Sequence, residues 1–500
     1  MEVNRGKLMW ASFLTLIAAG MGFAVRGGLL VIWGKKFGFT QFELGTITGG
    51  GLAGFGIVIL IASLVTDRVG YKAILTLAMV LHILSLIITL GASPAYAAMG
   101  RDGAYWFLYM GVFVFAVANG LCETAINPLI ANIYPERKTH YLNILHAGWP
   151  AGLVVGGLLG LIFVSDNIPW EIPLALYGLP TIWYGYIIIK EPFPDSDVKK
   201  AGISFGDMMK EFVSPVLLFL LILHAGVGYV ELGTDSWITN ITNSILTGQG
   251  FYLFIYTSLL MTALRFFAGP IVEKINPLGL LCVSTVLGTV GLLMLGSVEG
   301  AAMVWIAVTI YGLGKTFLWP TMLGIVGERF PRGGAVTMGA IGGAGALSAG
   351  FLGGPLIGYK QDVAATSYVQ EKSEDTYGRY KKADENKVLL GLLPSIQGLD
   401  GQKVGTLLDG GKGAKDEAER FKENEAVQEH YKWWTEVGKP NEAKDKETIG
   451  PARTYGARKA LIWTAAVPAG MCIGYLLLVF YFASQGGYKE VDLKDEEEKT

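Results

Sequence analysis

Ionisable side chains stand near the middle of several long apolar segments of this chain, where charge is unexpected. If these segments cross a bilayer, each charge costs several kcal/mol, so each such residue is a candidate for binding or proton transfer. Carboxylates and imidazoles can exchange protons, and guanidinium and ammonium groups can hold anions. The candidates are Arg26, Glu123, His146, His224, Glu231, Asp235 and Lys315.

One polar stripe runs through the apolar segment 104–132. Asn119, Glu123 and Asn127 follow one another at intervals of four residues, which places them on one face of a helix. Pro128 frees a backbone carbonyl beside this stripe, as proline often does in membrane helices with a functional break. We predict that Glu123 exchanges a proton and that the two asparagines contact a solute.

A second polar face is predicted in segment 213–238. His224, Glu231 and Asp235 fall at i, i+7 and i+11, again on one side of a helix, with glycines between them and Trp237 following. Glycine-containing, broken helices at matched positions in two halves of a membrane protein point to a binding site. We therefore predict that this face lines such a site.

Arg26 and His146 each have two interpretations. Arg26 could hold a carboxylate or phosphate through two parallel hydrogen bonds. It could equally neutralise Glu123 or Glu231, because buried charges are usually paired. His146, at the start of segment 143–165, could relay protons or be an ordinary hydrogen-bonded residue.

Aromatic side chains near these positions could stack on the face of a sugar ring. In membrane helices, however, such residues more often pack or anchor at the interface. The candidates are Trp149, Trp237, Tyr311 and Trp319. The sequence contains no phosphate-binding loop, metal-ligand cluster or nucleophile with a well-spaced base, so we expect no enzyme, no metal and no cofactor.

The composition predicts a membrane protein. The 500 residues are 52% hydrophobic and 16% charged, whereas a soluble chain carries about a quarter charged residues. The net charge of -2 gives no indication of nucleic-acid binding. Because a span needs ~20 mainly apolar residues, we predict twelve transmembrane helices: 8–32, 43–65, 72–92, 104–132, 143–165, 171–190, 213–238, 249–272, 278–298, 301–327, 334–358 and 459–483.

The two halves of the chain resemble each other. Residues 19–27 read A-G-M-G-F-A-V-R-G and residues 225–233 read A-G-V-G-Y-V-E-L-G. Later in each half, Pro128 with Glu136-Arg137 corresponds to Pro320 with Glu328-Arg329. Two similar bundles are typical of secondary transporters, whose site lies between the halves. The repeat aligns Lys315 with Glu123, which predicts either an ion pair that opens and closes across the cavity or a static structural pair.

The distribution of charge in the short loops predicts the orientation. With the N-terminus inside, most short-loop lysines and arginines fall on the inner side, as expected for a cell membrane protein with both termini cytoplasmic. The polar segment 359–457 would then lie outside. Residues 361–455 hold 18 acidic and 15 basic side chains, and 413–437 reads as a polar helix. This insertion could be a lid, a docking surface for a partner, or a solvated addition.

Motifs of one transporter family are recognisable. Residues 63–72, S-L-V-T-D-R-V-G-Y-K, resemble the loop signature between spans two and three of the major facilitator superfamily, with matches at Leu64, Asp67, Arg68, Gly70 and Lys72. Residues 135–138, P-E-R-K, resemble its loop after span four. Residues 122–128, C-E-T-A-I-N-P, resemble the E-T-A-x-N-P stretch of its fucose–proton symporter group.

The resemblance implies roles for several positions. In the superfamily the loop residues latch the two halves on the cytoplasmic side, which would carry over to Asp67, Arg68, Gly70, Lys72, Glu136 and Arg137. In the symporter group the span-four glutamate takes part in proton coupling, which would carry over to Glu123. That group has an acidic residue in span one, where this chain has Arg26.

We therefore expect an all-α membrane protein of two pseudo-symmetric six-helix bundles, the major facilitator fold. The predicted units are an N-terminal bundle (1–190), a linker (191–212), a C-terminal bundle (213–483) interrupted by 359–457, and a tail (484–500). The predicted function is alternating-access transport of a small polar solute, a sugar first, coupled to protons or to sodium. The alternatives are transport of a sugar acid or other organic anion and a non-transporting receptor. A monomer in the lipid bilayer is expected.

Overall fold

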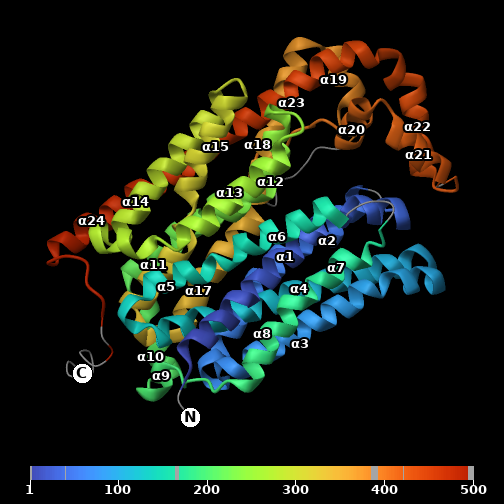
Figure 1. Cartoon of the computed structure of the whole chain (residues 1–500). Helices are drawn as coiled ribbons and strands as arrows, with labels where there is room; N and C mark the ends of the chain where they lie inside the picture. Colours follow the sequence, from blue (N-terminus) through green and yellow to red (C-terminus); the bar gives the residue numbers. More distant parts are fainter. Residues whose placement is uncertain are drawn as a thin grey trace.

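The computed structural model describes residues 3–39, 41–163, 168–383, 392–420, 422–491 and 493. Its described residues form helices almost throughout, and an isolated antiparallel β-bridge joins Lys381 to Leu399. Figure 1 shows two groups of long helices side by side, with both ends of the chain at the same end of the molecule.

The first group is built from the N-terminal helices. They are α1 (Arg5–Phe37), α2 (Gln41–Val69), α3 (Tyr71–Leu90), α4 (Ala92–Ile133), α5 (Lys138–His146), α6 (Gly148–Phe163), α7 (Glu171–Leu176) and α8 (Gly178–Lys190). The pairs α5–α6 and α7–α8 each make one broken span. The linker that follows carries α9 (Asp197–Lys200) and α10 (Phe205–Lys210).

The second group repeats this pattern and carries the insertion. Its helices are α11 (Pro215–Gly228), the π-helix η3 (Tyr229–Gly233), α12 (Thr234–Ile245), α13 (Gly250–Arg265), α14 (Ala268–Ser297), α15 (Ala301–Lys315), α16 (Leu318–Arg329), α17 (Gly334–Ser348), the π-helix η5 (Ala349–Gly353), α18 (Gly354–Lys372), α23 (Glu442–Thr464) and α24 (Ala466–Ser484). Between the groups, α2 packs along α17, α5 against α16, and α6 against α13.

The fold predicted from the sequence is confirmed. Each of the twelve predicted spans falls on helix, and ten helical stretches among the described residues are long and apolar enough to cross a bilayer. α13 is a shorter apolar helix. Large apolar side chains such as Trp183 on α8 and Phe480 on α24 are 63% and 69% exposed, as expected where lipid covers the outer surface.

Prolines explain where the spans break. Pro150 lies four residues after His146, the last residue of α5, and Pro320 lies four residues after Thr316, the residue that follows α15. Proline has no N–H to donate to the carbonyl four residues earlier, and its ring crowds that carbonyl. Each break therefore leaves a buried carbonyl that needs another donor.

Close helix contacts require glycine at the π-helices of the second bundle. η3 and η5 pack against each other, and a Cβ atom at Gly233 would lie 2.8 Å from the Cα atom of Gly353. A Cβ at Gly228 would lie only 1.9 Å from the carbonyl oxygen of Gly345 on α17. These glycines allow α11 and α12 to approach α17 and α18 directly.

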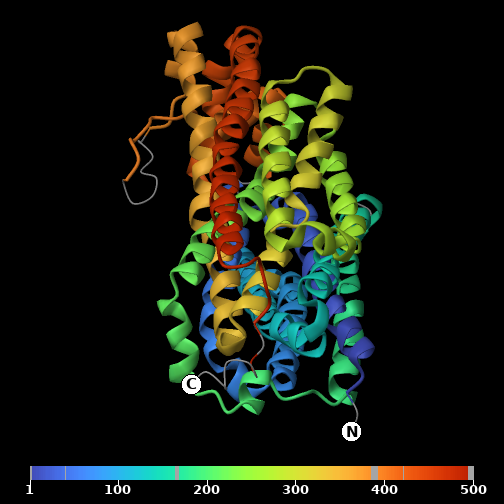
Figure 2. The same cartoon turned by 90° about the vertical axis from the view of Figure 1, so that its left-hand side faces the viewer.

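The insertion is a folded unit rather than an extended solvated segment. α18 and α23 extend beyond the bundle, and between them lie α19 (Glu374–Tyr380), α20 (Gly401–Asp409), α21 (Lys412–Arg420) and α22 (Glu425–Trp433). Figure 2 shows the helices of the insertion, in orange and red, at the end of the molecule opposite to both termini. Tyr380, Leu407, Trp434 and Ile449 belong to its buried core, and Arg379 pairs with the buried Asp445.

The prediction of one polar helix over 413–437 is wrong. The segment contains α21 and α22 as separate helices, with α22 capped by Asn424, whose side chain accepts a hydrogen bond from Val427 N. Each of these helices has an amphipathic sequence, so a helical segment was correctly expected. The sequence pattern did not show that there are two short helices, which pack against one another. Of the predicted tail 484–500, residues 492 and 494–500 lie outside the described residues.

Candidate functional site

The polar stripe of α4 meets α5 in a buried hydrogen-bonded cluster. Asn127 Nδ2 donates to Glu123 Oε2 over 2.7 Å, and His146 Nε2 lies 2.9 Å from Asn127 Oδ1. The same imidazole nitrogen is 4.0 Å from Glu123 Oε2, and the side chains of His146 and Glu123 are 4% and 10% exposed. Among the described residues, no lysine or arginine lies within ion-pair distance of Glu123. Its carboxyl group therefore has hydrogen-bonding partners but no fixed counter-charge.

A buried arginine of the second bundle meets this cluster from the opposite side. Arg265 Nη1 donates to the His146 carbonyl, and Nε donates to the Thr316 carbonyl, each over 2.7 Å. Nη2 donates over 2.7 Å to Glu231 Oε1, and both side chains of this pair are at most 5% exposed. The sequence analysis missed Arg265, although it stands in the predicted span 249–272 and meets the criterion used for Arg26.

Glu231 lies in the π-helix that breaks the first span of the second bundle. Its second oxygen, Oε2, accepts a hydrogen bond from Trp319 N over 3.3 Å. His224 lies on α11, just before η3, and its ring centroid is 4.7 Å from that of Trp319. Both His224 ring nitrogens are buried without a hydrogen-bond partner among the described residues. The predicted second polar face is thus present and buried.

The predicted ion pair between Glu123 and Lys315 is not formed. Lys315, whose side chain is completely buried, pairs with Asp235 of α12 in its own bundle. The repeat correctly indicated that Lys315 is buried, but it could not indicate that an acidic residue on a neighbouring helix would be nearer than Glu123. Tyr311 lies beside this pair, with its ring centroid 5.4 Å from Lys315 Nζ, and donates to the Val230 carbonyl.

The predicted pairing of Arg26 with Glu123 or Glu231 is also wrong. Arg26 is 3% exposed and lies inside the first bundle, where Nη2 donates to Ser85 Oγ over 2.9 Å. Its guanidinium carbon is 4.0 Å from the ring centroid of Phe115 and 4.8 Å from that of Tyr177. Aromatic faces replace a carboxylate as its surroundings. Its Nε has no hydrogen-bond partner among the described residues.

The other residues that were predicted to contact a solute instead hydrogen-bond to or pack against neighbouring helices. Asn119 Oδ1 is 2.8 Å from His82 Nε2, which ties α4 to α3. Trp149 packs against Phe23 with ring centroids 5.8 Å apart. Trp237 Nε1 donates to the Gly354 carbonyl over 2.9 Å and so joins α12 to α18. No group of histidine, cysteine or carboxylate side chains suited to a metal occurs in the described part of the chain.

Two of the predicted gate residues reach across the bundles. Asp67 Oδ2 accepts a hydrogen bond from Ala335 N, at the start of α17, over 2.7 Å. Arg137 pairs with Glu273. Counted from the repeats at 19–27 and 225–233, Glu273 is the counterpart of Asp67. Equivalent loops of the two halves therefore each contact the other bundle.

The other predicted gate residues act within the first bundle. Lys72 Nζ donates to the Ile189 and Glu191 carbonyls, and Glu136 lies 3.4 Å from Arg5. Gly70 has a positive φ of 94°, which favours glycine at the turn between α2 and α3. Arg68 is exposed to solvent.

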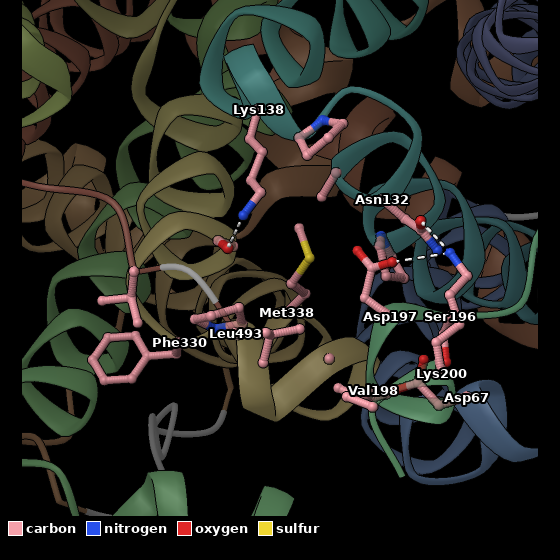
Figure 3. Close-up of a pocket in the computed structure, with 18 of the residues that line it drawn as sticks. Asp67, Asn132, Lys138, Ser196, Asp197, Val198, Lys200, Phe330, Met338 and Leu493 are labelled. Atoms are coloured by element: carbon pink, nitrogen blue, oxygen red, sulfur yellow. Dashed lines mark hydrogen bonds and ion pairs between the residues drawn. The ribbon is translucent and has the colours of Figure 1, made fainter. Parts of the chain in front are cut away.

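Further contacts close this end of the molecule. Glu328 at the end of α16 accepts hydrogen bonds from Thr139 of the first bundle, through both N and Oγ1. Tyr488 of the tail donates to Glu328 Oε2 over 2.6 Å. A cavity of about 610 Å³ remains between the two bundles here, lined by Asp67, Asn132 and Lys138 among others (Figure 3). The bundles are therefore joined at the end that carries both termini.

Residues 12–354 match the family model of the Major Facilitator Superfamily. The chain belongs to this superfamily. Its fold of two helix bundles, with buried polar residues between them, agrees with this assignment. Members of this superfamily are membrane transporters for small-molecule solutes and are not enzymes.

Curated relatives are similar over only part of their length. The class E tetracycline resistance protein of Escherichia coli is 23% identical over 283 residues, which cover 53% of this chain and 65% of the relative. The L-fucose–proton symporter of Escherichia coli strain K12 is 26% identical over 147 residues, 29% of this chain and 31% of the relative. The chain thus spans less than two thirds of these relatives.

Solved transporters share the fold at low identity. The fucose symporter FucP in its outward conformation matches with a TM-score of 0.59 at 17% identity, covering 72% of this chain and 92% of FucP. The proton:xylose symporter XylE matches with a TM-score of 0.61 at 12% identity, covering 74% and 90%. A bacterial homologue of human Spinster, facing inward, gives 0.61 at 16% identity, covering 95% and 96%.

Proposed function

We propose that this superfamily member is a proton-coupled transporter that moves a small polar solute, a sugar in the first instance, by alternating access. The observation that carries the proposal is the environment of Glu123. Its side chain is only 10% exposed and is hydrogen-bonded to Asn127, and no lysine or arginine in the described part of the chain lies within ion-pair distance of it. A carboxyl group placed in this way can alternate between protonated and ionised forms as the bundles move.

Sugar transport is supported by the C-E-T-A-I-N-P stretch and by the L-fucose–proton symporter among the relatives. Asn127, His146 and the other buried polar groups could hydrogen-bond to hydroxyl groups, and Trp319 offers an aromatic face. The polar groups of His224 that lack partners would be satisfied by a solute or by water.

An organic anion is the second candidate substrate. Arg26 is buried without an acidic partner among the described residues, and its Nε is not hydrogen-bonded. The carboxylate of a sugar acid could supply both the missing acidic partner and a hydrogen-bond acceptor for Nε. A human organic anion transporter also shares the fold, with a TM-score of 0.54 at 13% identity. Efflux is a further option, since two tetracycline resistance proteins are among the relatives.

The orientation is part of the proposal. We place both termini and the closed end of the bundles in the cytoplasm, on the basis of the lysines and arginines in the short loops. The structure then has a closed cytoplasmic side, and the insertion stands outside the cell.

Uptake by reconstituted protein tests the function. Proteoliposomes are offered a panel of labelled neutral sugars and sugar acids, with and without an inwardly directed proton gradient. The proposal expects that one neutral sugar accumulates only with the gradient, and that Glu123→Gln removes accumulation but keeps exchange. Accumulation of sugar acids alone would favour the second candidate. Accumulation driven by sodium and not by protons would contradict proton coupling.

A further inference from the structure

Arg265 occupies a place that neither the repeat nor the proposed proton site explains. Its side chain is 1% exposed, and its hydrogen bonds to the described residues go to buried acceptors. Two of these acceptors are backbone carbonyls. They belong to His146 and Thr316, which precede Pro150 and Pro320 by four residues. Arg265 therefore supplies the donors that both prolines cannot supply.

The two carbonyls lie in different bundles. His146 ends α5 in the first bundle. Thr316, which follows α15, lies in the second bundle, and so does Arg265, the last residue of α13. The hydrogen bond from Nη1 to the His146 carbonyl consequently crosses the boundary along which the bundles must move. When the bundles separate on this side, that bond has to break, and the carbonyl loses its donor unless water or a solute replaces it.

The same arginine is connected to the proton site by short hydrogen bonds. The imidazole of His146 is 2.9 Å from Asn127, which donates to Glu123 over 2.7 Å. On the other side, Arg265 Nη2 holds Glu231 in the π-helix η3. Glu123 in one bundle is therefore linked to Glu231 in the other by hydrogen bonds through Asn127, His146 and Arg265, with the ring of His146 facing Asn127 and its backbone carbonyl facing Arg265.

We infer that Arg265 is a positioning residue that couples the state of Glu123 to the relative movement of the two bundles, by bridging the proline-freed carbonyls of His146 and Thr316. It contacts Glu123 only through His146 and Asn127. The planar guanidinium is suited to this task because it presents donors in three directions at once. A lysine offers its donors from a single nitrogen and cannot reproduce that geometry. This inference rests on the proposed function.

The test compares accumulation with exchange in proteoliposomes for wild type, Glu123→Gln and Arg265→Lys. Arg265→Lys keeps a positive charge beside Glu231, so the protein should fold and exchange solute. Proton-driven accumulation should fall about tenfold relative to exchange, the effect of losing one coupling interaction of ordinary size. A structural role alone would lower both activities, or the yield of protein, without changing their ratio. An unchanged ratio would overturn the inference.

Two proline variants test the same bridge without altering the charge. Pro150→Ala restores an N–H that can donate to the His146 carbonyl and so competes with the bond between the bundles. Pro320→Ala does the same for the Thr316 carbonyl, within one bundle, and is the matched control. Pro150→Ala should reduce the accumulation-to-exchange ratio, and Pro320→Ala should leave it near the wild-type value. Equal ratios for the two variants would contradict the inference, even if Arg265→Lys failed to fold.

The same assay separates this inference from the proposed function. If wild-type protein shows no dependence on the proton gradient, the proposed function fails. If wild type is gradient-driven and Glu123→Gln is not, but Arg265→Lys and Pro150→Ala behave as wild type, only the role of Arg265 fails.

Discussion

At the scale of single residues, the central cluster contains two neutralised acidic residues and one that is not. Glu231 is held by Arg265, and Asp235 by Lys315, whereas Glu123 has amide and imidazole neighbours. A buried ion pair seldom adds much net stability, but removal of one partner leaves the other charge uncompensated. The two pairs are therefore expected to fix the second bundle, while Glu123 is left to change its protonation.

The pair of Lys315 and Asp235 gives the first prediction. Lys315→Met or Asp235→Asn alone should each lower the free energy of unfolding by about 3–5 kcal/mol, because each leaves one buried charge unpaired. The double variant should recover most of that loss. The measurement is thermal unfolding of the purified protein in detergent. Neutralising Lys36, which forms a more exposed pair with Glu171, serves as control and should cost less than about 1 kcal/mol.

A double variant that is no more stable than the singles would show that the two side chains do not form the stabilising pair seen in the structure. In that case Lys315 would again be available as a partner for Glu123.

At the scale of elements, the helices follow from hydropathy, but their internal breaks do not follow equally well. Proline marks the breaks before Pro150 and Pro320 by a known steric rule. The π-helices η3 and η5 have no such mark, because their sequences Y-V-E-L-G and A-G-F-L-G also suit an α-helix. They arise where two helices pack glycine against glycine, which is a property of the pair and not of either sequence.

The glycines of α1 and α11 give a prediction at this scale. The repeat aligns Gly22 with Gly228 and Gly27 with Gly233. Gly228→Ala should cost about 1–3 kcal/mol through overpacking, since its Cβ would meet the Gly345 carbonyl at 1.9 Å. Gly27→Ala, with nothing within 4 Å of the added Cβ, should be neutral or stabilising by up to about 1 kcal/mol.

The check is the melting temperature of the two alanine variants, compared with wild type. A Gly228→Ala protein as stable as Gly27→Ala would mean that α11 and α17 are not in direct contact.

The candidate site was partly predictable from the sequence. Rare charges in apolar segments indicated Glu123, Glu231 and Lys315. In the structure Glu231 and Lys315 are buried, and the Glu123 side chain is 10% exposed. Their partners were not predictable, because the repeat gives the depth of a residue in the bilayer but not its neighbouring helix. Arg26 illustrates this: in the aligned repeats 19–27 and 225–233 it lies one position from Glu231, yet it faces Phe115 inside its own bundle.

At the scale of the whole molecule, the structure is closed at the end that carries both termini. The bonds from Asp67 to Ala335 and from Arg137 to Glu273 use equivalent loops of the two halves. A third connection is made by Glu328, which accepts hydrogen bonds from Thr139 of the first bundle. Tyr488 Oη and Val491 N of the tail both donate to Glu328 and so hold it in place. Opening of this end therefore requires Glu328 to release Thr139, and the docked tail opposes that release.

The tail contact predicts an effect of Tyr488→Phe. Loss of the hydrogen bond to the Glu328 carboxylate should weaken docking of the tail by about 1.5–3 kcal/mol and open the end more often. The readout is the rate of thiol labelling at Asn132→Cys, which lines the cavity in Figure 3, in a background without the native cysteines. The rate should rise for Tyr488→Phe and stay unchanged for Tyr481→Phe, an exposed control on α24. Equal rates would exclude the tail as a latch.

Docking of the tail should also depend on pH. Burial, and secondarily the nearby Glu328 carboxylate, raise the pKa of Glu490 above its usual value. An acid with a raised pKa in the docked state binds its proton more tightly there. Docking is thus strongest below the ordinary carboxyl pKa and weakens as the pH rises through the raised pKa. Labelling at Asn132→Cys should increase over that range, and Glu490→Gln should remove the dependence; a dependence that persists would require another group.

The most direct test of the account follows protons and not solute. Transported solute is added outside proteoliposomes that have no ion gradient, and the external pH is recorded. For wild type, solute entry should make the external medium more alkaline, because each transport cycle carries a proton inward on Glu123. Glu123→Gln should exchange solute without any pH change. Solute entry by wild type with no accompanying alkalinisation would contradict proton coupling at Glu123.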